Sequence, residues 1–256
     1  MRLQNIPTEA PDDLDKDAAR EETAALATHI GERQTLLWAE RTRAVLVVLQ
    51  GMDASGKDSV ARNVFGGCNP VGIRAVSLKA PTDDEKAHDF LWRVHPHTPA
   101  KGEIGLFIRS HYEDVLIHKV RGWADADRLR VRYDAINAFE RLLRDDGATT
   151  VLKFCLHQSK KQQKKELLER LEDDTKHWKH NAGDWAEREL WDDYMEAYND
   201  ALTICSDIPW TVVPSDKGWY RNLVVARAVA AALDALPLAY PTLPDGEAEA
   251  FIKAHA

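Results

Sequence analysis

Residues 51–58 read GMDASGKD and combine the spacing of a phosphate-binding loop with two carboxylates. Gly51, Gly56 and Lys57 match the pattern G-x-x-x-x-G-K, in which backbone N–H groups surround phosphate oxygens and the lysine adds a positive charge. The next position normally carries a Ser or Thr whose hydroxyl binds magnesium. Here it is Asp58, so the loop departs from the usual arrangement at the residue that would serve the metal.

The two loop carboxylates are candidate metal ligands, because a phosphate chain carries magnesium and magnesium prefers oxygen ligands. Asp53 and Asp58 are candidates to bind the metal directly or through water. For either residue alone, a structural role as a helix cap or a first-turn acid is the alternative. The loop positions expected around the phosphates are Gly51, Ala54, Ser55, Gly56, Asp58 and Ser59.

A second group of polar residues follows the apolar segment IGLFI at 104–108. An enzyme with this loop usually carries an aspartate at the end of a second strand to help hold magnesium, but this segment ends in Ile108. Arg109 is a candidate to hold phosphate oxygens with its planar guanidinium; the alternative is a solvated ion pair. Glu113 and Asp114 supply acids slightly further along the chain.

The elements that must position these residues alternate between strands and helices. The continuous apolar run 44–50 is typical of a buried parallel strand, and it leads through the glycine-rich loop into a helical pattern. Further strands are expected at 73–80, 104–108, 150–157 and 210–214, and helices at 21–43 and 125–144. Ser159 is expected to cap a helix, and Asp184 and Glu187 have capping-box spacing for another. This order predicts an α/β fold with a parallel sheet flanked by helices.

The composition fits one folded domain, since 256 residues of which 44% are hydrophobic can bury a core. We expect a flexible arm at 1–20, a single domain at 21–236 and a tail at 237–256. The net charge of −8 argues against a nucleic-acid partner. No apolar run approaches the roughly 20 residues of a membrane span, so we expect no membrane partner and a cytoplasmic location. The three cysteines, far apart in the sequence, are interpreted as small core residues.

Several segments of the chain resemble the polyphosphate kinase 2 family, whose members move phosphoryl groups between inorganic polyphosphate and nucleotides. The resemblance extends from about residue 35 to 236. It rests on GMDASGKD (51–58) and on the segments 79–116, 176–194 and 209–223. The wording RSHYEDVL is similar to the single-domain subgroup that accepts nucleoside mono- and diphosphates, usually AMP and ADP. The resemblance implies a P-loop kinase-like (thymidylate-kinase-like) fold with a helical lid at about 160–192.

The resemblance also implies roles for individual residues. Asp53 corresponds to the family's magnesium-binding aspartate, Lys57 to the lysine that contacts the transferring phosphate, and Arg109 to a basic position near the phosphates. These three are the expected catalytic residues. Ile108 departs from the Asp or Asn that the family carries there, so Glu113 is the expected second metal ligand. Further phosphate-binding residues are expected at Arg93, Lys176, Lys179 and Arg221, and nucleotide-binding residues at Lys79, Thr82, Asp83, Glu85 and Glu113.

The segment KHWKH, residues 176–180, is the expected cover of the site. Its two lysines could place positive charge over a polyanion and exclude water during transfer. By composition alone a solvated basic loop is the alternative, and the family resemblance favours the lid. Trp178, Trp185 and Trp191 are expected to pack the lid helices rather than stack on a base.

The sequence therefore predicts a reversible polyphosphate-dependent kinase for AMP and ADP. Such transfer requires alignment and charge neutralisation more than a protein nucleophile, so Mg²⁺, with Mn²⁺ as the alternative, is the expected cofactor. The expected partners are polyphosphate, AMP, ADP and ATP. The resemblance alone implies a homo-oligomer, a dimer or a tetramer. Two alternatives stay open: an ATP-dependent nucleotide kinase on the same fold, and a weakly catalytic regulator that binds polyphosphate or nucleotides.

Overall fold

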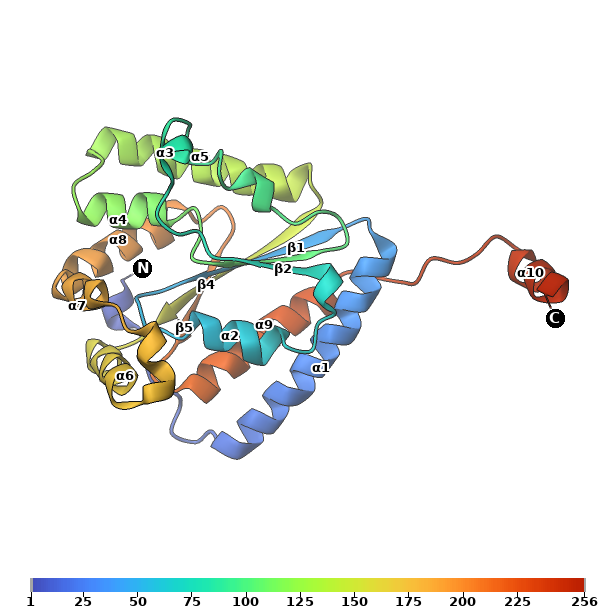
Figure 1. Ribbon diagram of the computed structural model, residues 1–256, viewed down its shortest axis with the longest axis horizontal. Coiled ribbons are helices and arrows are strands. Elements are labelled where there is room, and N and C mark those ends of the chain that lie inside the picture. The colour runs from blue at the N-terminus through green and yellow to red at the C-terminus, as the bar shows by residue number, and fades with distance from the viewer. Residues whose placement is uncertain (1, 256) are drawn as a thin grey trace.

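The computed structural model describes residues 2–255 and shows a parallel sheet with helices on both faces (Figure 1). Within these residues the sheet has five strands in the order β2-β3-β1-β4-β5, and every neighbouring pair is parallel. The strands are β1 Ala44–Gln50, β2 Ile73–Val76, β3 Ile104–Ile108, β4 Thr149–His157 and β5 Trp210–Pro214. The α/β fold predicted from the alternating pattern is confirmed.

Two helical layers enclose the sheet (Figure 1). One contains α1 Lys16–Glu40, α2 Lys57–Phe65 and α9 Gly218–Asp234, which pack against one another. The other contains α4 Glu113–Val120, α5 Ala126–Asp145 and α8 Trp191–Ile204. The remaining α-helices of the described chain are α3 Asp83–Lys86, α6 Lys160–Glu172, α7 Ala182–Glu189 and α10 Glu247–His255.

Each face of the sheet has its own apolar core. Ile30, Val60 and Val225 belong to the core under α1, α2 and α9, and Phe107 and Phe139 belong to the core under α4, α5 and α8. Strand β1 lies in the middle of the sheet, and all seven of its residues are buried. A continuous apolar run is therefore what a strand covered on both faces requires. The carboxyl ends of β1, β3 and β4 lie at one edge, so the loops that follow them meet there.

The N-terminal segment differs from the flexible arm expected at 1–20. Leu3 is only 1% exposed, and its backbone N–H donates to Asn199 Oδ1 at 2.7 Å. Thr8 donates through its hydroxyl to Asp216 Oδ2 at 2.9 Å. Asp15 then caps α1, which begins at Lys16 rather than at residue 21. One apolar side chain and a few specific hydrogen bonds hold this segment against α8 and the loop before α9, although its average composition is polar.

The lid region also differs in detail from the prediction. Ser159 caps α6 as expected, and its hydroxyl accepts from Gln162 N at 3.1 Å. Asp184, however, lies inside α7, and Asn181 is the residue that caps this helix. The single helix expected to start at Asp184 is interrupted at Leu190, so that α7 and α8 are separate. The capping-box spacing was therefore coincidental, because a side chain three residues earlier already occupies the helix start.

The termini and the cysteines complete the fold. The tail after Leu236 is extended and ends in the exposed helix α10, which projects away from the body of the domain (Figure 1). Cys68, Cys155 and Cys205 are buried and form no disulfide, in agreement with the interpretation as core residues. Among residues 2–255, each helix is too short or too polar to cross a lipid bilayer.

Candidate active site

The loop between β1 and α2 is held in a conformation that requires glycine at two positions. Gly51 has φ +154° and Gly56 has φ +90°. A Cβ atom at Gly56 would also lie 2.0 Å from Nη1 of Arg221, a residue of α9. Arg221 is buried and donates to Ser55 O at 3.1 Å, and burial lowers the pKa of its guanidinium to about 10. Arg221 therefore packs on the phosphate-binding loop, and it lines the larger of two cavities at this site, while phosphate binding by Arg221 stays a prediction.

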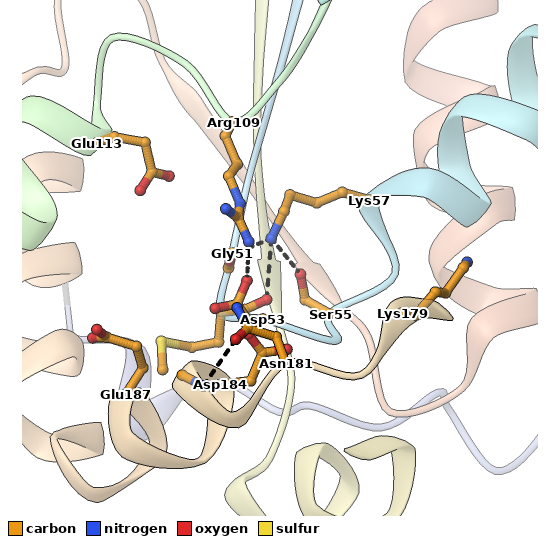
Figure 2. A network of polar contacts seen from close by, with 12 residues as sticks. Gly51, Asp53, Ser55, Lys57, Arg109, Glu113, Lys179, Asn181, Asp184 and Glu187 are labelled. Carbon is orange, nitrogen blue, oxygen red and sulfur yellow. Dashed lines mark hydrogen bonds and ion pairs between the residues drawn. The ribbon is translucent and has the colours of Figure 1, made fainter. Parts of the chain in front are cut away.

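Lys57 occupies the first turn of α2 and points back into the loop (Figure 2). Its Nζ donates to Gly51 O at 2.6 Å and to Met52 O at 3.1 Å, and only 8% of the residue is exposed. Burial lowers the pKa of Lys57, and the charge of Asp53 opposes that effect. A lysine bonded to carbonyl groups of its own loop is positioned to exchange these weak acceptors for phosphate oxygens.

Asp53 and Arg109 form an ion pair in the centre of the site (Figure 2). Arg109 follows β3 directly and has φ +65°, an uncommon conformation for a residue with a side chain. Its backbone N–H donates to Leu49 O of β1 at 3.2 Å, which fixes the arginine at the edge of the sheet. The fold thus brings together two of the predicted catalytic residues.

The main chain at Asp53 is held independently of its carboxylate. Gln158, after β4, and Gln163, in α6, donate to Asp53 O at 2.9 Å and 3.1 Å. Both glutamines are buried. Gln163 also accepts from Nη1 of Arg188 in α7 at 3.1 Å, which connects the lid helices to the loop. These two glutamines belong to no recognisable motif, so the amino-acid pattern gave no signal for their role.

Glu113 lies at the start of α4, and in Figure 2 Arg109 lies between Glu113 and Lys57. Its carboxylate accepts from Gln50 Nε2 at 3.0 Å, and Gln50 in turn accepts from the Ser110 hydroxyl at 3.3 Å. Burial raises the pKa of Glu113, and the hydrogen bond from Gln50 opposes this shift. The residue is therefore a positioned oxygen donor beside the loop.

Two adjacent cavities share the Asp53–Arg109 pair as part of their lining. The larger has a volume of about 610 Å³ and is bounded by the phosphate-binding loop, α2, the lid and α9. Basic side chains in its lining outnumber acidic ones, which favours a polyanion. The basic residues are Lys57, Arg62, Lys79, Arg109, Arg170, Lys176, Lys179 and Arg221, and the acidic residues are Asp53, Asp58, Glu166, Glu169 and Asp184.

The smaller cavity has a volume of about 210 Å³. It shares Asp53, Arg109, Asn181 and Asp184 with the larger cavity and also contains Glu113. Tyrosines of α8 and Glu187 of the lid complete much of its wall. The shared residues lie where groups bound in the two cavities would approach each other.

Both predicted lid lysines, Lys176 and Lys179, line the larger cavity, but they differ in their contacts with acidic residues. Lys179 Nζ lies 3.8 Å from Asp58 Oδ2, whereas Lys176 contacts Glu169 and also lies 3.3 Å from Asp173. The expectation that Trp178 packs the lid helices is wrong, because 78% of this residue is exposed and it lines the larger cavity. Trp191, the first residue of α8, is buried in the apolar core under α4, α5 and α8.

Four residues predicted to bind phosphate or nucleotide line neither the larger nor the smaller cavity. Arg93 is buried, pairs with Asp114 at 3.0 Å and donates to Lys79 O at 2.7 Å. The charge of Arg93 is thus neutralised inside the protein, where its hydrogen bond holds the loop after β2 that carries Lys79. Thr82 and Glu85 form the reciprocal cap of α3, and Asp83 pairs with Lys86 at 2.8 Å.

The lid also contributes residues that the sequence analysis did not assign to the site. Asp184 is buried and accepts from Arg170 Nη1 at 2.6 Å. Burial and the nearby charge of Asp53 raise the pKa of Asp184. Asn181, Asp184 and Arg170 all line the larger cavity, and so does Arg62 of α2. The sequence did offer one indication of this role, because Asn181 and Asp184 lie in the segment 176–194, which resembles the family and includes part of the predicted lid.

The donor set fits a magnesium–phosphate complex better than a bare ion. Among residues 2–255, no three His, Cys, Asp or Glu side chains are arranged to hold a metal by themselves. Magnesium is usually held by one or two carboxylates, with phosphate oxygens and water completing its octahedron. Asp53 and Glu113 both line the smaller cavity and offer such oxygens, so they stay the predicted ligands.

Comparison with known proteins decides the family. Residues 13–238 match the family model of polyphosphate kinase 2. The chain belongs to the polyphosphate kinase 2 family. It is 47% identical over 228 residues to an AMP/ADP-polyphosphate phosphotransferase of Meiothermus ruber, with 88% of this chain and 85% of the relative covered.

Two further relatives extend the comparison. The chain is 40% identical over 230 residues to an ADP-polyphosphate phosphotransferase of Rhodopseudomonas palustris, with 83% of this chain and 78% of the relative covered. The crystal structure of polyphosphate kinase 2 from Arthrobacter aurescens aligns with all of this chain and 93% of its own, with a TM-score of 0.95 and 42% identity. The predicted P-loop kinase-like fold and the resemblance behind it are confirmed.

Proposed function

We propose that this protein transfers a phosphoryl group from inorganic polyphosphate to AMP and ADP, and that the reaction is reversible. The observation that carries this proposal is the pair of adjacent cavities that meet at Asp53 and Arg109, one of them large and rich in basic side chains. The names of the Meiothermus and Rhodopseudomonas relatives support polyphosphate as donor and AMP or ADP as acceptor.

The chemistry follows from alignment and charge neutralisation. In phosphoryl transfer, negative charge is spread over the oxygens of the moving group, and preorganised donors stabilise it. Lys57 and the N–H groups of the loop supply donors from one side, and Arg109 supplies a planar guanidinium from the other. Mg²⁺, or Mn²⁺ in its place, held by Asp53 and Glu113 together with phosphate oxygens would neutralise the remaining charge.

The lid has a matching role. Lys179 and Arg170 line the larger cavity from the lid, and Asp184 and Asn181 reach the wall shared by both cavities. Water that enters during transfer would hydrolyse the donor instead of phosphorylating the acceptor. A lid that carries positive charge and covers the site would both neutralise phosphate and exclude water.

The decisive experiment is an acceptor screen with purified protein, polyphosphate and magnesium, with products separated by chromatography. Formation of ADP from AMP and of ATP from ADP is expected. A parallel reaction with ATP as donor tests the alternative of an ATP-dependent nucleotide kinase. Polyphosphate binding without any turnover at saturating magnesium would instead favour the weakly catalytic regulator.

The wider context is proposed on the same basis. ATP enters as the product of ADP phosphorylation and as the donor in the reverse direction. A cytoplasmic location fits enzymes that act on free nucleotides, and a homo-oligomer, dimer or tetramer, is proposed from the family resemblance. Light scattering after size exclusion would measure the number of subunits.

A further inference from the structure

The carboxylate that is proposed to bind the metal already has a cation. Asp53 is paired with the Arg109 guanidinium, and the two side chains are 23% and 40% exposed. Figure 2 shows the arginine reaching down from the end of β3 onto the loop. A guanidinium and a divalent ion both neutralise a carboxylate, so the two cations have overlapping roles at this residue.

The surroundings of the pair allow its side chains to separate without moving the main chain. The backbone of Asp53 is fixed through its carbonyl by Gln158 and Gln163, and the backbone of Arg109 is fixed by its hydrogen bond to Leu49. The guanidinium is the more exposed partner and lines both cavities. A change of side-chain rotamer is therefore enough to move it from Asp53 towards a ligand in either cavity.

Strain at Arg109 is consistent with a functional constraint. Its φ of +65° is a conformation that a residue with a Cβ adopts at a cost, and such outliers persist where surrounding structure determines them. The constraint here holds the base of the arginine side chain beside the phosphate-binding loop. Without it, the guanidinium would leave the edge of β3 in another direction.

We propose that Arg109 is a placeholder cation, which neutralises Asp53 in the unliganded protein and moves onto phosphate oxygens when a divalent ion takes its place. This inference rests on the proposed function for the identity of the phosphate ligand. It predicts that the free protein binds the metal weakly, because the ion must displace the guanidinium. It also predicts that metal and phosphate favour each other's binding, since phosphate gives the displaced arginine a new partner.

The test is the affinity of the unliganded protein for Mn²⁺, measured by electron paramagnetic resonance without nucleotide or polyphosphate. Arg109→Ala should bind Mn²⁺ about fivefold more tightly than the wild type, the factor that corresponds to a partly exposed ion pair. Arg109→Lys keeps a cation beside Asp53 and should remain within about twofold of the wild type. Asp53→Asn should abolish the tight binding in the Arg109→Ala background.

Arg62→Ala is the matched control for a general change in charge. Arg62 lines the same larger cavity, whereas the ion pair of Asp53 is with Arg109, so removal of the Arg62 charge should leave the Mn²⁺ affinity unchanged. Unchanged or weaker Mn²⁺ binding by a cooperatively melting Arg109→Ala protein would overturn the inference. Equal tightening by Arg62→Ala would overturn it too, since general electrostatics would then explain the effect.

Failure of this inference is distinguishable from failure of the proposed function. The same wild-type preparation is assayed for phosphoryl transfer from polyphosphate to AMP and ADP. A wild type that transfers phosphate, together with an Arg109→Ala protein of unchanged Mn²⁺ affinity, would remove the placeholder role alone. Inorganic phosphate, added at a concentration that does not sequester Mn²⁺, should tighten Mn²⁺ binding in the wild type and not in Arg109→Ala.

Discussion

Removing the negative partner of a buried ion pair beneath the site should strongly destabilise the protein. Lys153 of β4 and Glu140 of α5 are 0% exposed, with Nζ and Oε2 2.6 Å apart. Glu140 also accepts from the Tyr112 hydroxyl at 2.7 Å and lies 3.2 Å from His111 Nε2. Because Tyr112 lies between Arg109 and Glu113 in sequence, the network also anchors the segment that carries both site residues.

The magnitude follows from the burial of the pair. Glu140→Gln keeps the shape of the side chain but leaves the Lys153 charge without its counterion, and loss of one partner of a buried pair typically costs about 3–5 kcal/mol. Lys153 retains the Cys205 carbonyl at 2.9 Å and the Trp210 ring at 4.9 Å. We therefore expect the lower end, about 3 kcal/mol, and a fall in Tm of roughly 6–12 °C for a chain of this size.

The assay is thermal and denaturant unfolding of the wild type, Glu140→Gln, Lys153→Met and the double variant. The double variant should recover most of the lost stability, because removing both charges of a buried pair is often neutral. A loss below about 1 kcal/mol for Glu140→Gln, or a double variant less stable than that single variant, would refute the reasoning.

The pH dependence of Glu140→Gln gives an independent check. Burial lowers the pKa of Lys153, and the carboxylate of Glu140 normally opposes this shift. In Glu140→Gln, Lys153 holds its proton less tightly in the folded state than in the unfolded state. The resulting loss of stability is present below the unfolded pKa of lysine, about 10.4, and shrinks as pH rises towards that value. The stability gap between Glu140→Gln and the wild type should therefore be smaller at pH 9 than at pH 6.

Three further predictions concern the site itself. Lys57→Met should abolish transfer in a protein that still melts cooperatively, because methionine fills the space of the buried stem but brings no charge to phosphate; substantial turnover by the folded variant would exclude the assigned role. Lys179→Met should raise the KM for polyphosphate more than Lys176→Met, because the Lys176 ammonium already contacts two carboxylates; equal KM values for the two variants would contradict this. Ile108→Asp should lower the magnesium concentration for half-maximal activity, because it adds an oxygen ligand to the lining of the larger cavity. If a magnesium titration with AMP and with ADP shows an unchanged or higher magnesium requirement, position 108 is not a metal-ligand position.

Local sequence patterns were sufficient for the main elements of the fold. The strands expected at 104–108 and 210–214 have those bounds, and β1 follows the apolar run at 44–50. A strand buried on both faces needs apolar residues throughout, and a phosphate-binding loop needs glycine where the backbone turns sharply. These requirements concern only a few neighbouring residues, so the sequence pattern is sufficient to predict them. Strand β2 ends at Val76, before the predicted residue 80, because a strand ends where its hydrogen-bonded pairing with the neighbouring strand, here β3, ends.

The chemical types at the site were also evident from the sequence, and their pairing was not. The loop motif and the family resemblance identified Asp53, Lys57 and Arg109, but nothing local indicates that Asp53 and Arg109, 56 residues apart, form an ion pair. Composition likewise gave no reason to separate Arg93, whose charge is buried against Asp114, from the arginines that line the cavity.

Burial and partnership were decided by the tertiary structure alone. Trp178 is exposed although its type favours the core, and Leu3 is buried although its segment is polar, because each outcome depends on which distant elements pack nearby. The sequence by itself determined where phosphate-binding groups and strands occur, since backbone conformation and side-chain chemistry are local properties. Only the folded chain decided which charges meet, because an ion pair or a cavity wall exists once segments far apart in sequence are brought together.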